Sequence, residues 1–170
     1  MPSNNDYNTI NKKNMKSLLA CSILVLAMSC NSSAQKNKTA FKIVKTEAEW
    51  KAQLSNEAYY VLRKAGTERP FTSPLNKNYE AGTYVCKGCG TPLFKSEHKF
   101  DSGTGWPSFD REIKGNVAFS TDYKIGYART EEHCATCGGH LGHVFNDGPK
   151  NTTGKRHCIN GVALQFLPSK

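Results

Sequence analysis

Cysteine is the residue whose spacing in this sequence most directly indicates chemistry. Two Cys-x-x-Cys motifs, formed by Cys86 with Cys89 and by Cys134 with Cys137, are each followed by a glycine. Two intervening residues let one tight turn direct both thiolates at a single tetrahedral ion, and the glycine permits a positive φ in that turn. Four thiolates fill the coordination sphere of Zn²⁺, so we predict one structural zinc ion per chain. Disulfide bonds and a thioredoxin-like redox pair are the alternatives.

Cys158 belongs to neither motif and lies in the segment Lys155–Asn160. A cation beside a thiol favours the ionised, nucleophilic form, so Arg156 indicates a reactive cysteine. If the segment is a β-strand, its alternation places Arg156, Cys158 and Asn160 on one face. His157 then points to the other face. A lone cysteine can also be a small buried hydrophobic residue, but these polar neighbours favour a nucleophile.

Two further segments combine polar and aromatic side chains. Residues 140–147 contain His140 and His143, which titrate near neutral pH and can act as general acids. A second metal-ligand pair or structural histidines are the alternatives, but four cysteines already complete one zinc site. Residues 100–109 hold Trp106 between a glycine and a proline, which favours a loop and a place in the wall of a pocket.

The elements that must position these residues are also indicated by the sequence. Thr46 and Glu49 form a capping box, and the apolar spacing after them predicts two short helices at about 46–54 and 56–65. From residue 83 onward, β-rich pieces alternate with Gly, Pro, Asn and Asp at short intervals. The predicted strands are residues 83–86, 117–121, 126–130 and 162–167. We therefore predict a mainly β fold, with one small antiparallel β domain and short N-terminal helices.

Composition limits the class of protein. A chain of 170 residues corresponds to one domain with a tail, and 38% hydrophobic with 22% charged residues excludes disordered, fibrous and multi-span membrane classes. The formal net charge is +9, but the cations are scattered and form no long run. We therefore expect a solvated basic surface and no nucleic-acid partner.

The N-terminal segment is typical of an export signal. An apolar run at residues 18–28 follows Lys16 and is too short for a comfortable membrane span. A lipobox-like sequence ends at Cys30, and a small-x-small cleavage pattern ends at Ala34. We expect a lipoprotein anchored at Cys30, or otherwise secretion after Ala34, in both cases on the periplasmic side of a bacterial cell envelope. An uncleaved anchor or a buried core helix is the alternative.

Three parts of the chain are therefore expected. Residues 1–30 form an N-terminal extension and leader, residues 31–45 a polar linker, and residues 46–170 the folded domain. Met15 followed by a lysine is a more usual start than Met1, so the first 14 residues can be an extension. We expect membrane contact only through the possible lipid anchor.

Over about residues 46–170 the sequence resembles the methionine sulfoxide reductase B family. The matched segments, in chain order, are Glu68–Phe71, the two Cys-x-x-Cys motifs, Gly105–Phe109, His140–Phe145 and Arg156–Asn160. The resemblance implies two small antiparallel β-sheets in a β-tent-like arrangement, with a four-cysteine zinc site remote from the catalytic centre. It implies that Cys158 is the nucleophile and that Trp106, with Phe145, binds the substrate. The polar pocket residues that it implies are His140, His143, Asp147, Arg156 and Asn160.

The implied reaction is the reduction of methionine-R-sulfoxide in oxidised proteins or peptides, a repair of oxidative damage. The Cys158 thiolate attacks the electrophilic sulfur, and His140 or His143 protonates the oxygen. Thioether leaves, and Cys158 becomes a sulfenic acid. Asp147 is expected to orient Arg156 or a histidine, and Trp106 to give the methyl group an apolar wall.

One position departs from the pattern of many relatives. Thr104 occupies the place of a second cysteine that reduces the sulfenic acid through an internal disulfide. We therefore expect an external reductant, either a small thiol or a thioredoxin-like protein. Two other functions are the alternatives: a zinc-stabilised binding module without enzymatic activity, and a thiol peroxidase that uses Cys158.

Overall fold

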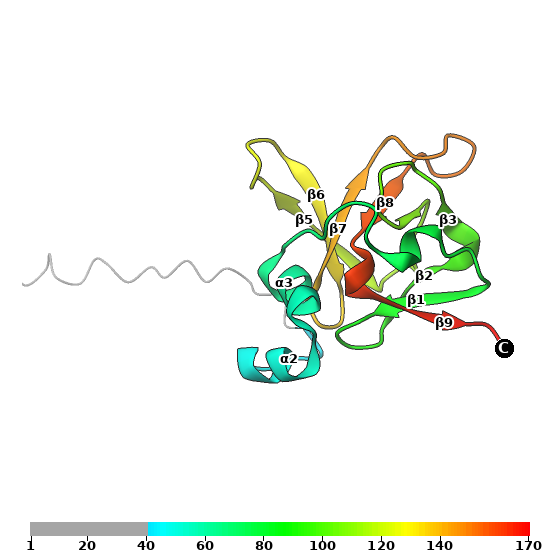
Figure 1. The fold of residues 1–170 in the computed structure, drawn as a ribbon. Helices are drawn as coiled ribbons and strands as arrows, with labels where there is room; N and C mark the ends of the chain where they lie inside the picture. The colour runs from blue at the N-terminus through cyan, green and yellow to red at the C-terminus, as the bar shows by residue number, and fades with distance from the viewer. Residues whose placement is uncertain (1–40) are drawn as a thin grey trace, which may run out of the picture. The chain divides into compact units, whose positions relative to one another are not determined.

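The computed structural model of the chain describes residues 41–170 (Figure 1). The predicted leader, with Cys30 and Ala34, lies outside the described residues, as does most of the predicted linker. Across residues 41–170, no helix combines the length and the apolar character that a membrane crossing requires.

Two short helices open the described part of the chain. Helix α2 comprises Glu47–Gln53 and begins with the predicted capping box, in which the Thr46 side chain and the Glu49 carboxylate each accept a backbone N–H. Helix α3 comprises Asn56–Lys64, is capped by Ser55 and ends at Ala65 in the left-handed conformation. Both predicted helices are confirmed.

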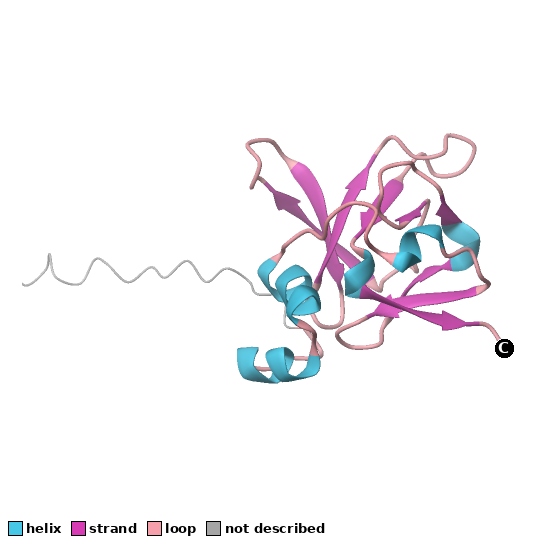
Figure 2. Ribbon diagram, viewed as in Figure 1, coloured by secondary structure: helices cyan, strands magenta, loops and turns pink. Residues whose placement is uncertain are grey.

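The strands form two antiparallel sheets (Figure 2). The three-stranded sheet has the order β2-β1-β9, with β1 at Gly82–Cys86, β2 at Pro92–Lys95 and β9 at Leu164–Pro168. The six-stranded sheet has the order β3-β4-β8-β7-β6-β5. Its strands are β3 (Lys99–Phe100), β4 (Ser108–Phe109), β5 (Val117–Asp122), β6 (Arg129–Cys134), β7 (His140–Phe145) and β8 (Arg156–Ile159). The predicted fold class is confirmed.

Two predicted strand boundaries were wrong. The strand expected at 126–130 begins only at Arg129, because residues between β5 and β6 form a turn. The Asp122 side chain accepts the backbone N–H of Lys124, and Gly126 has φ +87°. The strand expected at 162–167 begins at Leu164, because Gly161–Ala163 form a 3-10 turn after β8.

Aromatic side chains fill the space between the sheets. Phe94 of β2 stacks on Phe109 of β4 with ring centroids 4.4 Å apart, and Tyr84 of β1 packs edge-on against Phe109 at 4.9 Å. All three are buried. Since β4 pairs directly with β8, this core supports the strand that carries Cys158.

Candidate active site and metal cluster

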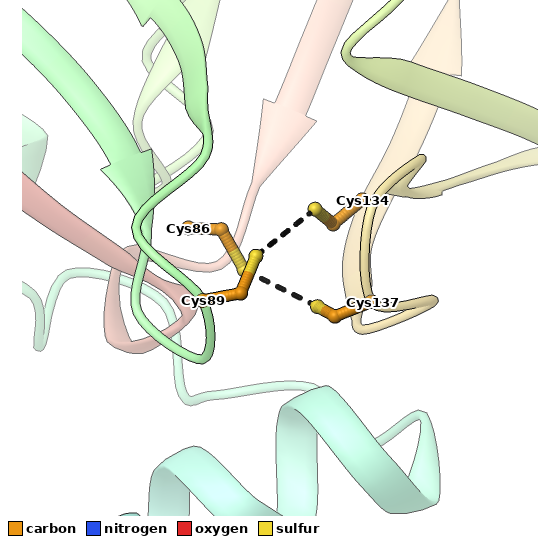
Figure 3. Close-up of side chains that lie close together, drawn as sticks. All are labelled: Cys86, Cys89, Cys134 and Cys137. Atoms are coloured by element: carbon orange, nitrogen blue, oxygen red, sulfur yellow. Dashed lines mark hydrogen bonds between the residues drawn. The ribbon is translucent and has the colours of Figure 1, made fainter. Parts of the chain in front are cut away.

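The four cysteines of the two Cys-x-x-Cys motifs converge on one point (Figure 3). Cys86 ends β1 and Cys89 lies in the turn to β2, whereas Cys134 ends β6 and Cys137 lies in the turn to β7. The glycine after each motif has a positive φ, as the sequence predicts: +75° at residue 90 and +70° at residue 138. One turn comes from each sheet, so the cluster joins the two sheets.

The spacing of the sulfur atoms fits a tetrahedral metal ion. The Sγ atoms of Cys86 and Cys137 are 3.8 Å apart, those of Cys89 and Cys134 are 3.5 Å apart, and all four lie within 4.8 Å of one another. Zinc–sulfur bonds of about 2.3 Å place tetrahedral sulfur ligands about 3.8 Å apart. A disulfide requires about 2.05 Å, and all five cysteines of residues 41–170 are free thiols.

The N-terminal helices hold both cysteine turns in place. At the end of α2, Gln53 donates to the backbone carbonyl of Gly88 at 2.6 Å. From α3, Arg63 donates to the carbonyl of Cys137 at 3.0 Å. Each helix therefore satisfies a carbonyl in a different turn, which fixes the turns relative to each other.

Cys158 lies within β8, opposite Ser108 of β4 and His143 of β7. Its half-buried thiol lines a pocket of about 130 Å³. The other residues that line this pocket are Thr67, Trp106, Arg129, Gly142, His143, Phe145 and Asn160. Five residues predicted to form the site therefore share one cavity: Cys158, His143, Trp106, Phe145 and Asn160.

Arg156 and Asp147 lie beside this pocket as an ion pair. The Arg156 Nε and Nη2 atoms each donate to a different carboxylate oxygen of Asp147, both at 2.9 Å. The guanidinium also lies over the Phe145 ring, 4.4 Å from its centroid. Of the two partners proposed for Asp147 from the sequence, the structure gives it Arg156.

The environment of Cys158 favours the neutral thiol more than the sequence suggested. Burial raises the pKa of Cys158, and the positive charge of Arg156 and a contact with Thr104 only partly offset this. The Thr104 Oγ1 atom lies 3.9 Å from the Cys158 Sγ atom. The sequence argument considered the cation alone, because burial is not visible in it.

Each of the two predicted histidines has a carboxylate partner. Nδ1 of His140 is 2.6 Å from Glu131, and Nε2 of His143 is 2.9 Å from Asp122. Asp122 also accepts from Arg129 at 2.5 Å. The two imidazole rings pack edge to face with centroids 5.5 Å apart. His143 lines the pocket of Cys158, whereas His140 is buried behind it.

The charge states around these histidines follow from their contacts. Hydrogen bonding to His140 lowers the pKa of Glu131 to about 2. The backbone N–H of Lys124, followed by His143, holds the pKa of Asp122 well below its usual range. Burial lowers the pKa of His143 although Asp122 opposes this. The bond to Asp122 fixes the orientation of the His143 ring in the wall of the pocket.

Sequence reasoning missed the three charged residues Asp122, Arg129 and Glu131. Asp122 and Arg129 face each other in the β5–β6 register, and Glu131 is opposite His143 in the β6–β7 register. No local motif marks them. Only the alternation of charged residues along 129–133 could have suggested a common face for Arg129 and Glu131.

Asn160, which the resemblance places among the polar pocket residues, binds backbone with both ends of its buried amide. Its Oδ1 atom accepts from the N–H of Glu68 at 2.9 Å, and its Nδ2 donates to the carbonyl of Leu141 at 2.8 Å. The amide thus ties the loop at residue 68 and strand β7 to the end of β8.

The loop at residue 68 also positions Trp106. The indole Nε1 donates to the Glu68 carbonyl at 3.2 Å. The Glu68 carboxylate accepts from the backbone N–H groups of Gly161 and Val162 at 2.6 and 2.8 Å. Glu68 was part of a matched segment but had no predicted role, and it anchors the indole to the turn that follows Cys158.

His157 points away from the pocket, as strand alternation predicts. It is buried on the opposite face of β8, and its Nδ1 atom is 2.6 Å from Glu132. Its Nε2 atom is 3.4 Å from Glu112. Neighbouring residues of β8 therefore face different surroundings: Cys158 faces the pocket, and His157 faces a buried carboxyl group.

The family model described as the SelR domain matches residues 54–168, which include both cysteine motifs and every pocket residue named above. The chain belongs to the SelR family, the methionine sulfoxide reductases B. The match covers both sheets and begins between helices α2 and α3.

Curated relatives match over nearly their whole length. The protein is 51% identical over 130 residues to "Peptide methionine sulfoxide reductase MsrB" of Chromohalobacter salexigens, covering 76% of this chain and 98% of the relative. It is 54% identical over 128 residues to the MsrB of Pseudomonas putida, covering 75% and 96%. A relative from Caenorhabditis elegans, named "Probable methionine-R-sulfoxide reductase B", is 50% identical over 122 residues, covering 71% and 80%. A solved Mis18 "Yippee-like" domain matches 54% of this chain and 99% of its own at 15% identity, with a TM-score of 0.43, which supports no conclusion.

Among residues 41–170 of this SelR family member, every cysteine other than Cys158 belongs to the four-cysteine cluster. The sequence after residue 40 contains five cysteines, and four of them belong to the cluster. The hydroxyl of Thr104 lies against Cys158 instead.

Proposed function

We propose that this protein is a peptide-methionine (R)-S-oxide reductase that repairs oxidised proteins or peptides. One observation carries the proposal: the thiol of Cys158, the imidazole of His143 and the indole of Trp106 line a single small pocket. A nucleophile, a proton donor and an apolar wall are the three groups that a methyl sulfoxide requires. Family membership and the names of the curated relatives support the same reaction.

The proposed reaction transfers the sulfoxide oxygen to Cys158. The thiolate attacks the sulfoxide sulfur and forms a sulfur–sulfur bond while the oxygen takes up a proton. The bonds of the methionine sulfur to Cys158 and to oxygen then break, and the methionine sulfur gains the two electrons that Cys158 loses. The oxygen ends on Cys158 as sulfenic acid, and methionine is released as the thioether. Arg156 stabilises the thiolate, and Asp147 holds Arg156 in place.

Protonation of the oxygen falls to His143, because this imidazole faces the pocket. His140 lies behind it, packs edge to face against its ring and bonds to Glu131. Trp106, held by Glu68, and Phe145 provide the apolar surface for the S-methyl group. Methyl and oxygen directed to opposite sides of the pocket select one epimer, consistent with one enzyme for each sulfoxide epimer.

The metal that we propose for the four-cysteine cluster is Zn²⁺. Cys86, Cys89, Cys134 and Cys137 provide four thiolates, the complete ligand set of a structural zinc site. When bound, zinc supplies cross-linking of the two sheets and no catalytic step. The distances between sulfurs support this assignment.

We further propose that an external thiol restores Cys158, because Thr104 stands where an internal partner would be needed. A small thiol or a thioredoxin-like protein fits this role. The apolar run at residues 18–28 supports export to the periplasmic side of a bacterial envelope, with a lipid on Cys30 or cleavage after Ala34. Mass spectrometry of the mature N-terminus tests this: a diacylated Cys30 or a free Gln35 supports export, and an intact Met1 or Met15 contradicts it.

The activity test uses the purified, zinc-loaded domain with dithiothreitol. The two sulfoxide epimers of N-acetylmethionine are supplied separately, and thioether is quantified by chromatography. We expect turnover of the R epimer only. Peroxide consumption without thioether would instead identify a thiol peroxidase, and inertness toward both would leave a zinc-stabilised binding module.

A further inference from the structure

A second hollow adjoins the Cys158 pocket, and the histidine–carboxylate network described above forms its base. It has a volume of about 320 Å³, and it shares Thr67, Arg129 and His143 with the pocket of Cys158. The two cavities therefore lie side by side. The Cys158 pocket, at about 130 Å³, has room for the end of one side chain, so the larger hollow remains beside a bound methionine sulfoxide.

The residues that line the hollow come from the C-terminal end of α3 and the loop after it, from the turn that joins β5 to β6, and from strands β6 and β7 at its base. Lys124 of that turn donates to the carbonyl of Ala65, which follows α3, at 3.2 Å. This hydrogen bond connects two walls of the hollow that are 59 positions apart in the sequence.

Its walls are apolar at the rim. Tyr60 of α3 is 55% exposed, and Ile125 of the turn is 53% exposed; both line the hollow. Exposed apolar side chains on facing walls of one depression mark a place where a ligand side chain can be buried.

The acidic groups at the base of the hollow are already neutralised. Asp122 is paired with Arg129 and His143, and Glu131 with His140 and Ser120. A positively charged ligand group therefore finds no free carboxylate partner there. The two cations of the lining are also engaged, Lys124 by the Ala65 carbonyl and Arg129 by Asp122, so a negatively charged group gains no free partner either. Apolar walls over a neutralised base favour an uncharged, apolar occupant.

We propose that this hollow is a binding subsite for an apolar side chain of the substrate peptide, two residues away from the methionine sulfoxide. In an extended peptide, side chains two residues apart point to the same side, roughly 6.6 Å apart. One side chain then enters the Cys158 pocket while the other enters the adjoining hollow. The inference rests on the proposed reductase function and extends it by a sequence preference two residues from the sulfoxide.

The test compares short blocked peptides that contain one methionine-R-sulfoxide among glycines. Leucine, aspartate or lysine replaces the glycine two positions before or two positions after the sulfoxide. We expect leucine on one of the two sides to raise kcat/KM by about 3- to 10-fold, as partial burial of its side chain predicts. Aspartate and lysine at that position give no increase.

Two variants in the same turn assign the effect to the hollow. Ile125→Asn removes an apolar wall, so the leucine advantage falls to within about 1.5-fold of the glycine peptide. Tyr127→Asn is the matched control, since Tyr127 is 60% exposed in the same turn but does not line the hollow. It keeps the full leucine advantage.

The outcomes separate the two proposals. Reduction of N-acetylmethionine-R-sulfoxide without any leucine advantage overturns the subsite and leaves the reductase function intact. A leucine advantage that Ile125→Asn does not diminish also overturns it. Absence of thioether from every substrate overturns the reductase function itself.

Discussion

The metal cluster and the active-site pocket use the same side chain in opposite surroundings. At the cluster, four thiols lie at the ends of strands and in the turns that follow them, on two different sheets, and all four sulfur atoms lie within 4.8 Å of one another. In the pocket, Cys158 stands alone within β8, and the groups around it are a hydroxyl, a guanidinium and an imidazole. Thiolates that share a cation hold structure together, whereas a single thiol next to proton donors remains free to react.

Turns and strands suit these two tasks for a physical reason. A turn with a following glycine can direct two sulfurs at one point, and it needs only local geometry. A strand residue has its direction fixed by pairing on both sides, here to β4 and β7, so the nucleophile cannot move away from its partners. Substitutions at Cys158 should therefore remove activity without affecting stability, whereas substitutions in the cluster should reduce stability first.

The largest effect expected is that of Cys158→Ser. A serine hydroxyl at this position is not ionised near neutral pH, so thioether formation falls to the rate without enzyme. Zinc content and the unfolding midpoint stay as in the wild type, because Cys158 takes no part in the cluster. Clear residual turnover of the R-sulfoxide, or loss of zinc, contradicts the separation of the two regions.

Substitution in the cluster has the converse result. Cys86→Ser or Cys134→Ser removes one of four zinc ligands, and structural zinc binding is worth on the order of 10 kcal/mol in small peptides. We expect zinc loss by elemental analysis and a large fall in the thermal midpoint, with activity lost through unfolding. A variant that keeps wild-type stability after zinc removal would falsify the structural role.

Glu132 and His157, on the face of β8 opposite Cys158, test how much that face contributes to the stability of the fold. Glu132 is 0% exposed with one carboxyl oxygen unpartnered, and His157, 2% exposed, is its hydrogen-bond partner. Removal of His157 alone, by His157→Phe, leaves a buried polar group without that partner and costs about 1–3 kcal/mol.

The double variant His157→Phe with Glu132→Val provides the control. Replacing both partners by apolar groups restores most of the lost stability. Denaturant unfolding of the zinc-loaded proteins measures both values. If the single and the double variant lose the same free energy of unfolding, the stability of Glu132 does not depend on His157, and this prediction is contradicted.

A smaller effect is expected from the charge next to the nucleophile. Burial raises the pKa of Cys158 and Arg156 opposes this, so Arg156→Met raises that pKa further. The thiolate is the form above the pKa, so the pH midpoint of alkylation moves upward. The rate at a fixed pH below the midpoint falls about tenfold for each unit of the shift.

Iodoacetamide labelling followed over a range of pH measures this midpoint. Lys155→Met is the matched control, since this neighbouring cation is exposed and bonds to Asn146 instead. An equal displacement in both variants would point to net charge alone and not to the contact with Arg156.

The smallest expected effect is a change in the oxidised form of Cys158 when Thr104 is replaced. One turnover of the R-sulfoxide without reductant leaves Cys158 as a sulfenic acid that a dimedone-type reagent traps, detected by mass spectrometry. Because the hydroxyl lies 3.9 Å from the Cys158 sulfur, Thr104→Cys instead forms a disulfide after a small approach of the two sulfurs. A disulfide between Cys158 and a cluster cysteine in the wild type contradicts the structural role of the cluster.

The sequence by itself determined the features that depend on short spacing. Two residues between cysteines and a following glycine are sufficient for a metal-binding turn, and both turns have this geometry. The capping box determined the start of α2. Strand alternation correctly separated Cys158 from His157, because the period of two is a property of the extended backbone itself.

Only the tertiary structure decided the partners and the electrostatics of the site. Asp122 and Arg129 reach His143 through strand register, and Glu68 holds Trp106 across 38 positions of sequence. Register depends on how whole strands pack, so no local pattern contains it. Burial raises the pKa of Cys158 where the neighbouring cation alone would lower it. Desolvation is set by everything that surrounds a group, and that is fixed only once the chain has folded.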